Sequence, residues 1–123
     1  MPGGARLLIQ SFRDVTVVNF TDASILDTVQ VQQIGEELYE LIDDKAIRKL
    51  ILDFSNVKFL SSSALGVLIT LRKKSDEIKG KVLLCGMKPD LRKIFKITNL
   101  EKLFDFYENE ERALNYFGVS TMG

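Results

Sequence analysis

The sequence contains no histidine, and its 123 residues include a single cysteine, Cys85. Without histidine, the chain cannot build a Ser-His-Asp triad, a Cys-His dyad, a histidine-ligated zinc site or a phosphohistidine relay. A lone cysteine cannot form an internal disulfide, which is typical of proteins from a reducing compartment. These chemistries are therefore excluded, and Cys85, which lies in an apolar run, is interpreted as a core residue.

The chain also has no excess of either charge and no long apolar run. Seventeen basic and 17 acidic side chains cancel, so overall charge does not favour binding to nucleic acid or to an acidic membrane surface. The apolar runs are far shorter than the ~20 residues of a membrane helix, and the polar, glycine-rich start does not resemble a secretion signal. These features predict a cytoplasmic protein that does not insert into membranes.

Apolar periodicity predicts short strands that alternate with helices. Strands are expected at 6–12, 14–20, 48–54, 82–86 and 103–107, the first two as an antiparallel pair. Helices are expected after Asp27, from Ser61 to about Lys79, from Pro89 to Asn99 and after Asn109. Asp27 and Gln30 have the spacing of a capping box at the start of the first helix. Gly80 is expected to end the second helix. Residues 21–27 and 55–58 are expected to be turns.

The order β-β-α-β-α-β-α-β-α predicts one α/β domain over residues 1–123, with an ordered core of about 6–117. Its sheet is expected to be mixed, mostly parallel and of about five strands, with helices packed against it. No linker divides the chain, and it contains no internal repeat.

The most informative stretch runs from Arg48 to Lys74, where a buried strand and a turn are followed by three serines and then by Ala64-Leu65-Gly66. A helix start leaves about four backbone N–H groups unpaired and carries roughly half a positive charge, which hydroxyls or a phosphate can satisfy. The serine run alone favours a simple helix cap over a phosphate acceptor. Gly66 costs the helix ~1 kcal/mol relative to alanine, so close packing or a partner must compensate.

Two other features could carry a function. Asp53 ends the third strand, where receiver domains of response regulators carry their phosphorylated aspartate, but the first strand lacks the acidic pair that binds magnesium in receivers. We therefore interpret Asp53 as a strand-end acid that accepts hydrogen bonds from loop N–H groups. The basic residues Lys88, Arg92, Lys93, Lys96 and Lys102 are interpreted as a solvated helix face rather than a nucleotide or nucleic-acid site, because no glycine-rich phosphate loop accompanies them.

The segment LDFSNVKFLSSSALGVL resembles the signature of STAS domains, specifically bacterial anti-sigma-factor antagonists, and KVLLCGM, PDLRKIFKITNL and EKLFDFYENEERAL extend the resemblance over nearly the whole chain. In that family a buried strand and a short loop precede Asp-Ser-Ser-Gly-Leu-Gly at a helix start. The family's phosphorylated serine corresponds to Ser62, with Ser61 and Ser63 as secondary candidates. Here Ser61 replaces the aspartate and Ala64 the first glycine, and residues 21–27 lack the Gly-Glu-Leu-Asp run of the antagonists.

The resemblance implies a phosphorylation-controlled binding switch and not an enzyme, with no catalytic residue, metal site or cofactor of its own. The implied partner is an anti-sigma factor with serine-kinase activity, which the unphosphorylated chain binds so that a sigma factor is released for transcription; the kinase supplies ATP and Mg²⁺. The implied contact residues are Ser61, Ser62, Ser63, Leu65, Gly66, Ser24, Ile25 and Asp27. A scaffold of a stress-sensing assembly and the STAS subunit of a lipid transporter are the alternatives, and a homodimer is left open.

Overall fold

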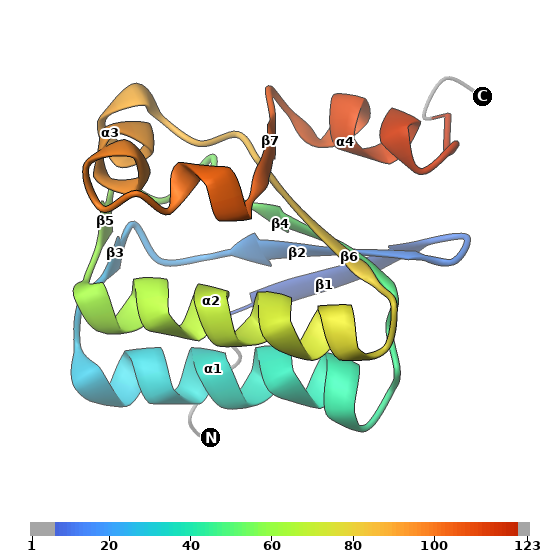
Figure 1. Ribbon diagram of the computed structural model, residues 1–123, viewed down its shortest axis with the longest axis horizontal. Coiled ribbons are helices and arrows are strands. Elements are labelled where there is room, and N and C mark those ends of the chain that lie inside the picture. Colours follow the sequence, from blue (N-terminus) through green and yellow to red (C-terminus); the bar gives the residue numbers. More distant parts are fainter. Residues whose placement is uncertain (1–6, 121–123) are drawn as a thin grey trace.

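The computed structural model describes residues 7–120 (Figure 1). Its strands are β1 (Leu7–Phe12), β2 (Val15–Phe20), β3 (Ser24–Ile25), β4 (Lys49–Asp53), β5 (Phe59–Leu60), β6 (Lys81–Cys85) and β7 (Asp105–Tyr107). Its helices are α1 (Thr28–Asp43), α2 (Ser62–Glu77), α3 (Pro89–Ile97) and α4 (Glu110–Tyr116), with a single 3₁₀ turn, η1 (Glu101–Leu103), before β7. The predicted α/β class and the order of the long elements are confirmed.

Five strands form one mixed sheet in the order β1-β2-β4-β6-β7. The β1–β2 pair is antiparallel, as predicted, whereas the β2–β4, β4–β6 and β6–β7 pairs are parallel. Successive side chains of a strand point to opposite faces of the sheet, so each strand contributes to two separate layers of packing. The sheet therefore has two apolar faces, and each must be covered by a helix.

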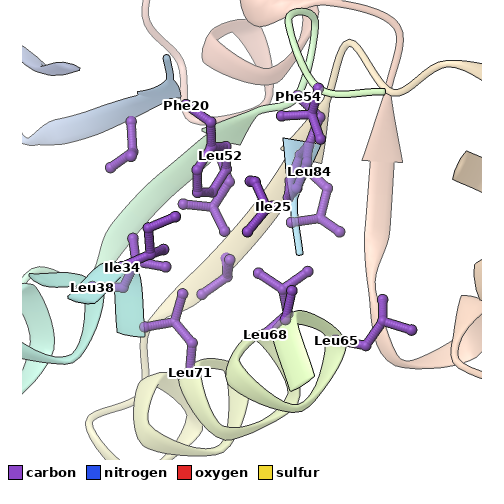
Figure 2. Packing of buried hydrophobic residues seen from close by; sticks show 14 of the residues in the cluster. Phe20, Ile25, Ile34, Leu38, Leu52, Phe54, Leu65, Leu68, Leu71 and Leu84 are labelled. Carbon is purple, nitrogen blue, oxygen red and sulfur yellow. The ribbon is translucent and has the colours of Figure 1, made fainter. Parts of the chain in front are cut away.

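Helices α1 and α2 lie side by side over one face of the sheet (Figure 1). Figure 2 shows Ile34 and Leu38 of α1 and Leu68 and Leu71 of α2 pointing toward the sheet residues Phe20, Leu52 and Leu84. Full burial of each such side chain contributes about 1.5–3 kcal/mol. These contacts fix α1 and α2 rigidly on the sheet.

Helix α4 covers the opposite face, where a smaller cluster forms. Ala113 and Leu114 of α4 pack there with Val17, Ile51 and Cys85 of the central strands. Cys85 is fully buried, as predicted, and burial raises the pKa of its thiol. The cysteine is therefore a core residue and not a reactive thiol.

A small second sheet, not predicted from the sequence, lies in the predicted turn at 21–27 and directly after the predicted turn at 55–58. Strand β3 pairs with β5 in parallel, with Ser24 opposite Phe59 and Ile25 opposite Leu60. The backbone N–H of Ser61 donates to the carbonyl oxygen of Ile25 at 3.0 Å, and that of Lys58 donates to Ala23 at 2.7 Å. The segments that lead into α1 and α2 are therefore joined directly to each other.

The predicted role of Gly80 as the terminator of α2 is wrong in detail. The residue with a left-handed backbone after α2 is Lys79, with φ of 59°. Gly80 is instead required by packing, since a Cβ atom there would lie 2.8 Å from the backbone oxygen of Arg48. The backbone turns at Lys79, and the next position, Gly80, has no room for a side chain.

Candidate functional site

The three serines at the start of α2 have different environments. Ser61 is the N-cap, with an extended backbone, and its Oγ accepts a hydrogen bond from the backbone N–H of Ala64 at 3.1 Å. Its own N–H donates to the carbonyl oxygen of Ile25, and its side chain is half-buried. Both the backbone and the hydroxyl of Ser61 are therefore engaged in hydrogen bonds within the domain. Ser62 and Ser63, the first two residues of α2, are exposed. The cap and the accessible hydroxyls are therefore separate residues.

The start of α1 has a charged cap. Asp27 Oδ2 accepts from the backbone N–H of Gln30 at 3.2 Å. The Gln30 side chain is buried, and its Oε1 accepts from the N–H of Leu26 at 3.2 Å, one residue before Asp27, whose N–H would be the donor in a regular capping box. Its Nε2 donates to the carbonyl oxygen of Ser24 and to the carboxylate of Asp22, both at 2.9 Å. Gln30 thus fixes the segment before α1, a role that the capping-box spacing only partly indicated.

Apolar side chains are exposed around the two helix starts. Leu26 precedes α1, Val29 lies in its first turn and Phe59 lies in β5, and their exposed fractions are 52%, 59% and 57%. Because β3 pairs with β5 and α1 packs on α2, the elements that carry these residues are neighbours. We call the exposed residues Leu26, Val29, Phe59, Ser62, Ser63 and Gly66 the serine surface.

The predicted contact residues divide between this surface and the core beneath it. Ser24, Asp27, Ser62, Ser63 and Gly66 are exposed, and Ser61 is half-buried. Ile25 and Leu65 are 2% and 7% exposed and belong to the core cluster, so they support the surface from below and do not present their side chains to a partner. The exposed apolar residues of this surface are instead Leu26, Val29 and Phe59; the signal in the sequence was that Leu26 and Val29 are apolar residues outside the buried stripe of α1.

The glycine in α2 has no packing function within the described chain. Gly66 is exposed, and a Cβ atom built on it would meet no atom within 4 Å. Close packing on the sheet is therefore not the reason for this residue. It is Ala64, buried at 6% exposure, that faces the core.

The start of α2 also lacks acidic residues. Among the four α-helices of residues 7–120, α1 has Asp27 at its cap, α3 has Asp90 in its first turn, and α4 begins with Glu110 and Glu111. Helix α2 has a neutral cap and no acidic residue in its first turn. Its partial positive charge is therefore not balanced by a carboxylate, which favours an added anion at this position.

Asp53 lies on the other face of the sheet, toward α4. As predicted, its Oδ1 accepts a loop N–H, that of Ser55, at 2.8 Å. The Asp53 carboxylate also forms a hydrogen bond with the Glu110 carboxyl, which was not predicted from the sequence. This hydrogen bond, burial and the charge of Asp53 raise the pKa of Glu110 to about 7, against a smaller opposing effect of Asn19. No group of three or more residues suited to holding a metal occurs within the described part of the chain.

The basic segment is partly used in internal contacts. The guanidinium of Arg92 lies 3.9 Å from the ring centroid of Phe106, and its Nη2 pairs with Glu101 at 3.0 Å. The Lys88 ammonium donates to the carbonyl oxygen of Ser55. Lys93 and Lys96 remain exposed. This arrangement agrees with a solvated helix face.

The STAS domain family model matches residues 7–113. The chain belongs to the STAS domain family. This STAS domain is 27% identical over 93 residues to a Bordetella bronchiseptica protein named as a candidate anti-sigma factor antagonist, BtrV, covering 76% of this chain and 79% of that protein. No helix in residues 7–120 is long and apolar enough to cross a bilayer.

Two solved structures show the same fold. An anti-sigma-factor antagonist domain protein from Planctomyces limnophilus superposes with a TM-score of 0.81 at 23% identity, covering 93% of this chain and 98% of that one. The Bacillus cell fate determinant SpoIIAA in its phosphorylated form superposes with a TM-score of 0.71 at 22% identity, covering 90% and 98%. The sheet, its helices and the α2 start therefore belong to a fold that this family shares.

Proposed function

We propose that this STAS domain is an anti-sigma-factor antagonist whose serine surface binds an anti-sigma factor with serine-kinase activity, and that phosphorylation of Ser62 releases this partner. The observation that carries the proposal is the exposed Ser62 at a helix start with a neutral cap and no acidic residue in its first turn, together with exposed Leu26, Val29 and Phe59 on neighbouring elements. The names of the similar proteins supply the class of partner.

The energetics favour release of a partner over rearrangement of the domain. A phosphate on Ser62 adds about 1.5 to 2 negative charges. At the start of α2 this charge stabilises the helix by about 0.3–2 kcal/mol, since it meets the positive end of the dipole. The same charge enclosed and unpaired in an interface costs about 3–5 kcal/mol, which corresponds to a loss of affinity of roughly a hundredfold to several thousandfold.

Gly66 supports an approach of the partner along α2. It lies one turn beyond Ser62 on the exposed side of the helix, and packing within the domain does not require a glycine at this position. A partner surface that lies close to the α2 backbone would account for a glycine that otherwise costs helix stability.

In this proposal the chain acts by binding alone. The kinase domain of the partner supplies ATP and Mg²⁺, and this chain contributes the acceptor hydroxyl. The work is done in the cytoplasm, where sigma factors meet RNA polymerase.

The decisive experiment uses each serine-kinase anti-sigma factor encoded in the genome of origin, purified and incubated with ATP and this chain. Intact-mass measurement should show one phosphoryl group on the wild type and on Ser63→Ala, and none on Ser62→Ala. Transfer that persists in Ser62→Ala but is lost in Ser63→Ala would move the acceptor to Ser63. Failure of all these kinases to bind or modify the folded wild type would overturn the proposal.

A further inference from the structure

The two edges of the five-stranded sheet are built differently. Strand β7 is three residues long and carries Asp105, whose carboxylate pairs with Lys81 at 2.8 Å. Its Phe106 ring packs on Phe95 with centroids 5.4 Å apart. Strand β1 is six residues long, contains no charged residue or proline, and pairs only with β2 within residues 7–120. Long uncharged edges are the kind that accept another strand.

Two large apolar residues in the middle of β1 are exposed on opposite faces. Ile9 lies opposite Val18, on the side of α1, and Leu8 lies opposite Asn19, on the side of α4. Their exposed fractions are 45% and 61%. A partner docked on one face of the sheet would cover only one of them. A strand added in the plane of the sheet would cover both.

We propose that β1 pairs antiparallel with β1 of a second copy of this chain, about a two-fold axis that is perpendicular to the sheet and passes midway between Ile9 of one copy and Ile9 of the other. This operation keeps each face on its own side, so Ile9 meets Ile9 of the second copy and Leu8 meets its Gln10. A register centred on Ile9 pairs residues 7–11 of both strands. The two five-stranded sheets become one.

The surroundings of Ile9 are self-complementary in charge. A shallow pocket beside Ile9 is lined by Leu41, Glu37, Glu40 and Lys45 of α1 and the residues that follow it. Glu37 lies four residues before Leu41 and Lys45 four residues after it, so the two opposite charges flank the axis. The two-fold axis therefore brings Glu37 of each copy toward Lys45 of the other. These two opposite-charge pairs outweigh the single like-charge approach of Glu40 to Glu40 of the other copy, which favours a second copy over an unrelated strand.

The pairing leaves the serine surface free. Helix α2 follows β4, and β2 lies between β4 and β1 in the sheet. A dimer joined at β1 can therefore present two serine surfaces at once. The interface is small, so we expect a weak dimer whose population rises with concentration.

The test is sedimentation equilibrium of the full chain over a wide concentration range, with two lysine variants. Ile9→Lys places like charges across the axis and should weaken dimerisation at least about tenfold. Ile97→Lys makes the same change on α3 at the most exposed large apolar residue, 83% exposed, and should leave dimerisation unchanged. A wild type that stays monomeric at millimolar concentration, equal dimerisation of both variants, or assembly beyond the dimer would overturn the proposal.

The register has its own test. Residues facing each other across an antiparallel pair have Cα atoms about 4.5–5.5 Å apart, within disulfide range. Under mild oxidation, Ile9→Cys should link to itself rapidly, whereas Leu8→Cys and Ile97→Cys should not; Cys85 is buried and does not compete. Equal cross-linking of the three variants would refute the register.

Discussion

Helices α1 and α2 are close counterparts, and their differences show which features serve the fold and which serve the proposed partner. Both are 16 residues long, both begin with a side chain that accepts a hydrogen bond from the third helical N–H, and both contain one glycine. A Cβ atom on Gly35 of α1 would lie 3.3 Å from Cγ2 of Val67, so α2 packs against that bare position. Gly66 of α2 faces open space.

The two helix starts differ in the same sense. Helix α1 has a permanent carboxylate, Asp27, at its cap, so its dipole is already balanced. Helix α2 has the neutral Ser61 at its cap and exposes Ser62 and Ser63 beyond it. In α1 the glycine and the charge both stabilise the domain, whereas in α2 both positions remain available to another molecule.

The largest effect should come from placing a charge at the start of α2. Ser62→Asp should weaken binding of the anti-sigma factor roughly a hundredfold or more, because an unpaired carboxylate would enter the interface. Ser62→Ala should bind like the wild type. Asn115→Asp is the control, since Asn115 is exposed on α4, on the opposite face of the sheet. Isothermal titration of the three variants would contradict the proposed role of the α2 start if Asn115→Asp weakened binding as strongly as Ser62→Asp.

The next effect concerns the small sheet that joins the two starts. Ile25→Ala should lower the free energy of unfolding by about 2–5 kcal/mol, because it opens a cavity beneath both helices. The neighbouring Leu26→Ala removes an exposed side chain and should change stability by less than about 0.5 kcal/mol, yet weaken partner binding. Urea unfolding followed by circular dichroism measures both. Similar losses of stability in the two variants would show that Leu26 also belongs to the core.

The two glycines provide the third test. Gly66→Ala should raise the free energy of unfolding by about 0.4–1 kcal/mol, because the helix accepts alanine and no neighbour obstructs it. The same variant should weaken partner binding. Gly35→Ala should gain less stability, since Val67 must move to admit the new methyl group. Thermal unfolding measures both variants, and a larger gain in stability for Gly35→Ala than for Gly66→Ala would contradict the comparison.

Helix α4 gives the opposite case, a helix start with too many carboxylates. Its first residue, Glu110, has a pKa raised from 4.5 to about 7 by hydrogen bonding to Asp53 and by burial. The folded state holds this proton more tightly than the unfolded state, so its contribution is present in full below pH 4.5 and is lost as pH rises through 7. Solvent screens the partly exposed group, so we expect a loss of only about 1 kcal/mol.

This pH dependence can be measured by urea unfolding at pH values from below 4.5 to above 7. Glu110→Gln should flatten the profile in that window, and Glu111→Gln in the same first turn is the control that should leave it unchanged. A profile that Glu110→Gln does not alter would show that the pH dependence does not come from a raised pKa of Glu110.

The sequence was sufficient to predict the long elements, because their apolar periods are clear and their caps are local. Asp27, Ser61 and Asn109 each accept the expected N–H of the helix that they precede. The β3–β5 pair was missed because two residues are too few to show an alternating pattern. The Asp53–Glu110 pair was missed because its members are far apart in sequence and meet only once α4 folds over the sheet.

The candidate site was predicted in position but not in composition. The serine run located the helix start, since capping is a local property. Which side chains face outward depends on packing from both helices and the small sheet, so Leu65 and Ile25 were assigned to the surface although they are buried. Phe59, an exposed aromatic residue in a short strand, could be found only from the structure.

The parallel register of β3 and β5 also limits how these proteins can diverge. Each strand is two residues long, and the backbone N–H groups of Lys58, Phe59 and Ser61 donate to carbonyl oxygens of the segment before α1, which connects the entrances of the two helices. Inserting a single residue between Thr21 and Asp27 would shift Ile25 away from Leu60 and tilt the start of α2. Homologues that exchange partners should therefore vary the side chains of these two loops while keeping their lengths matched.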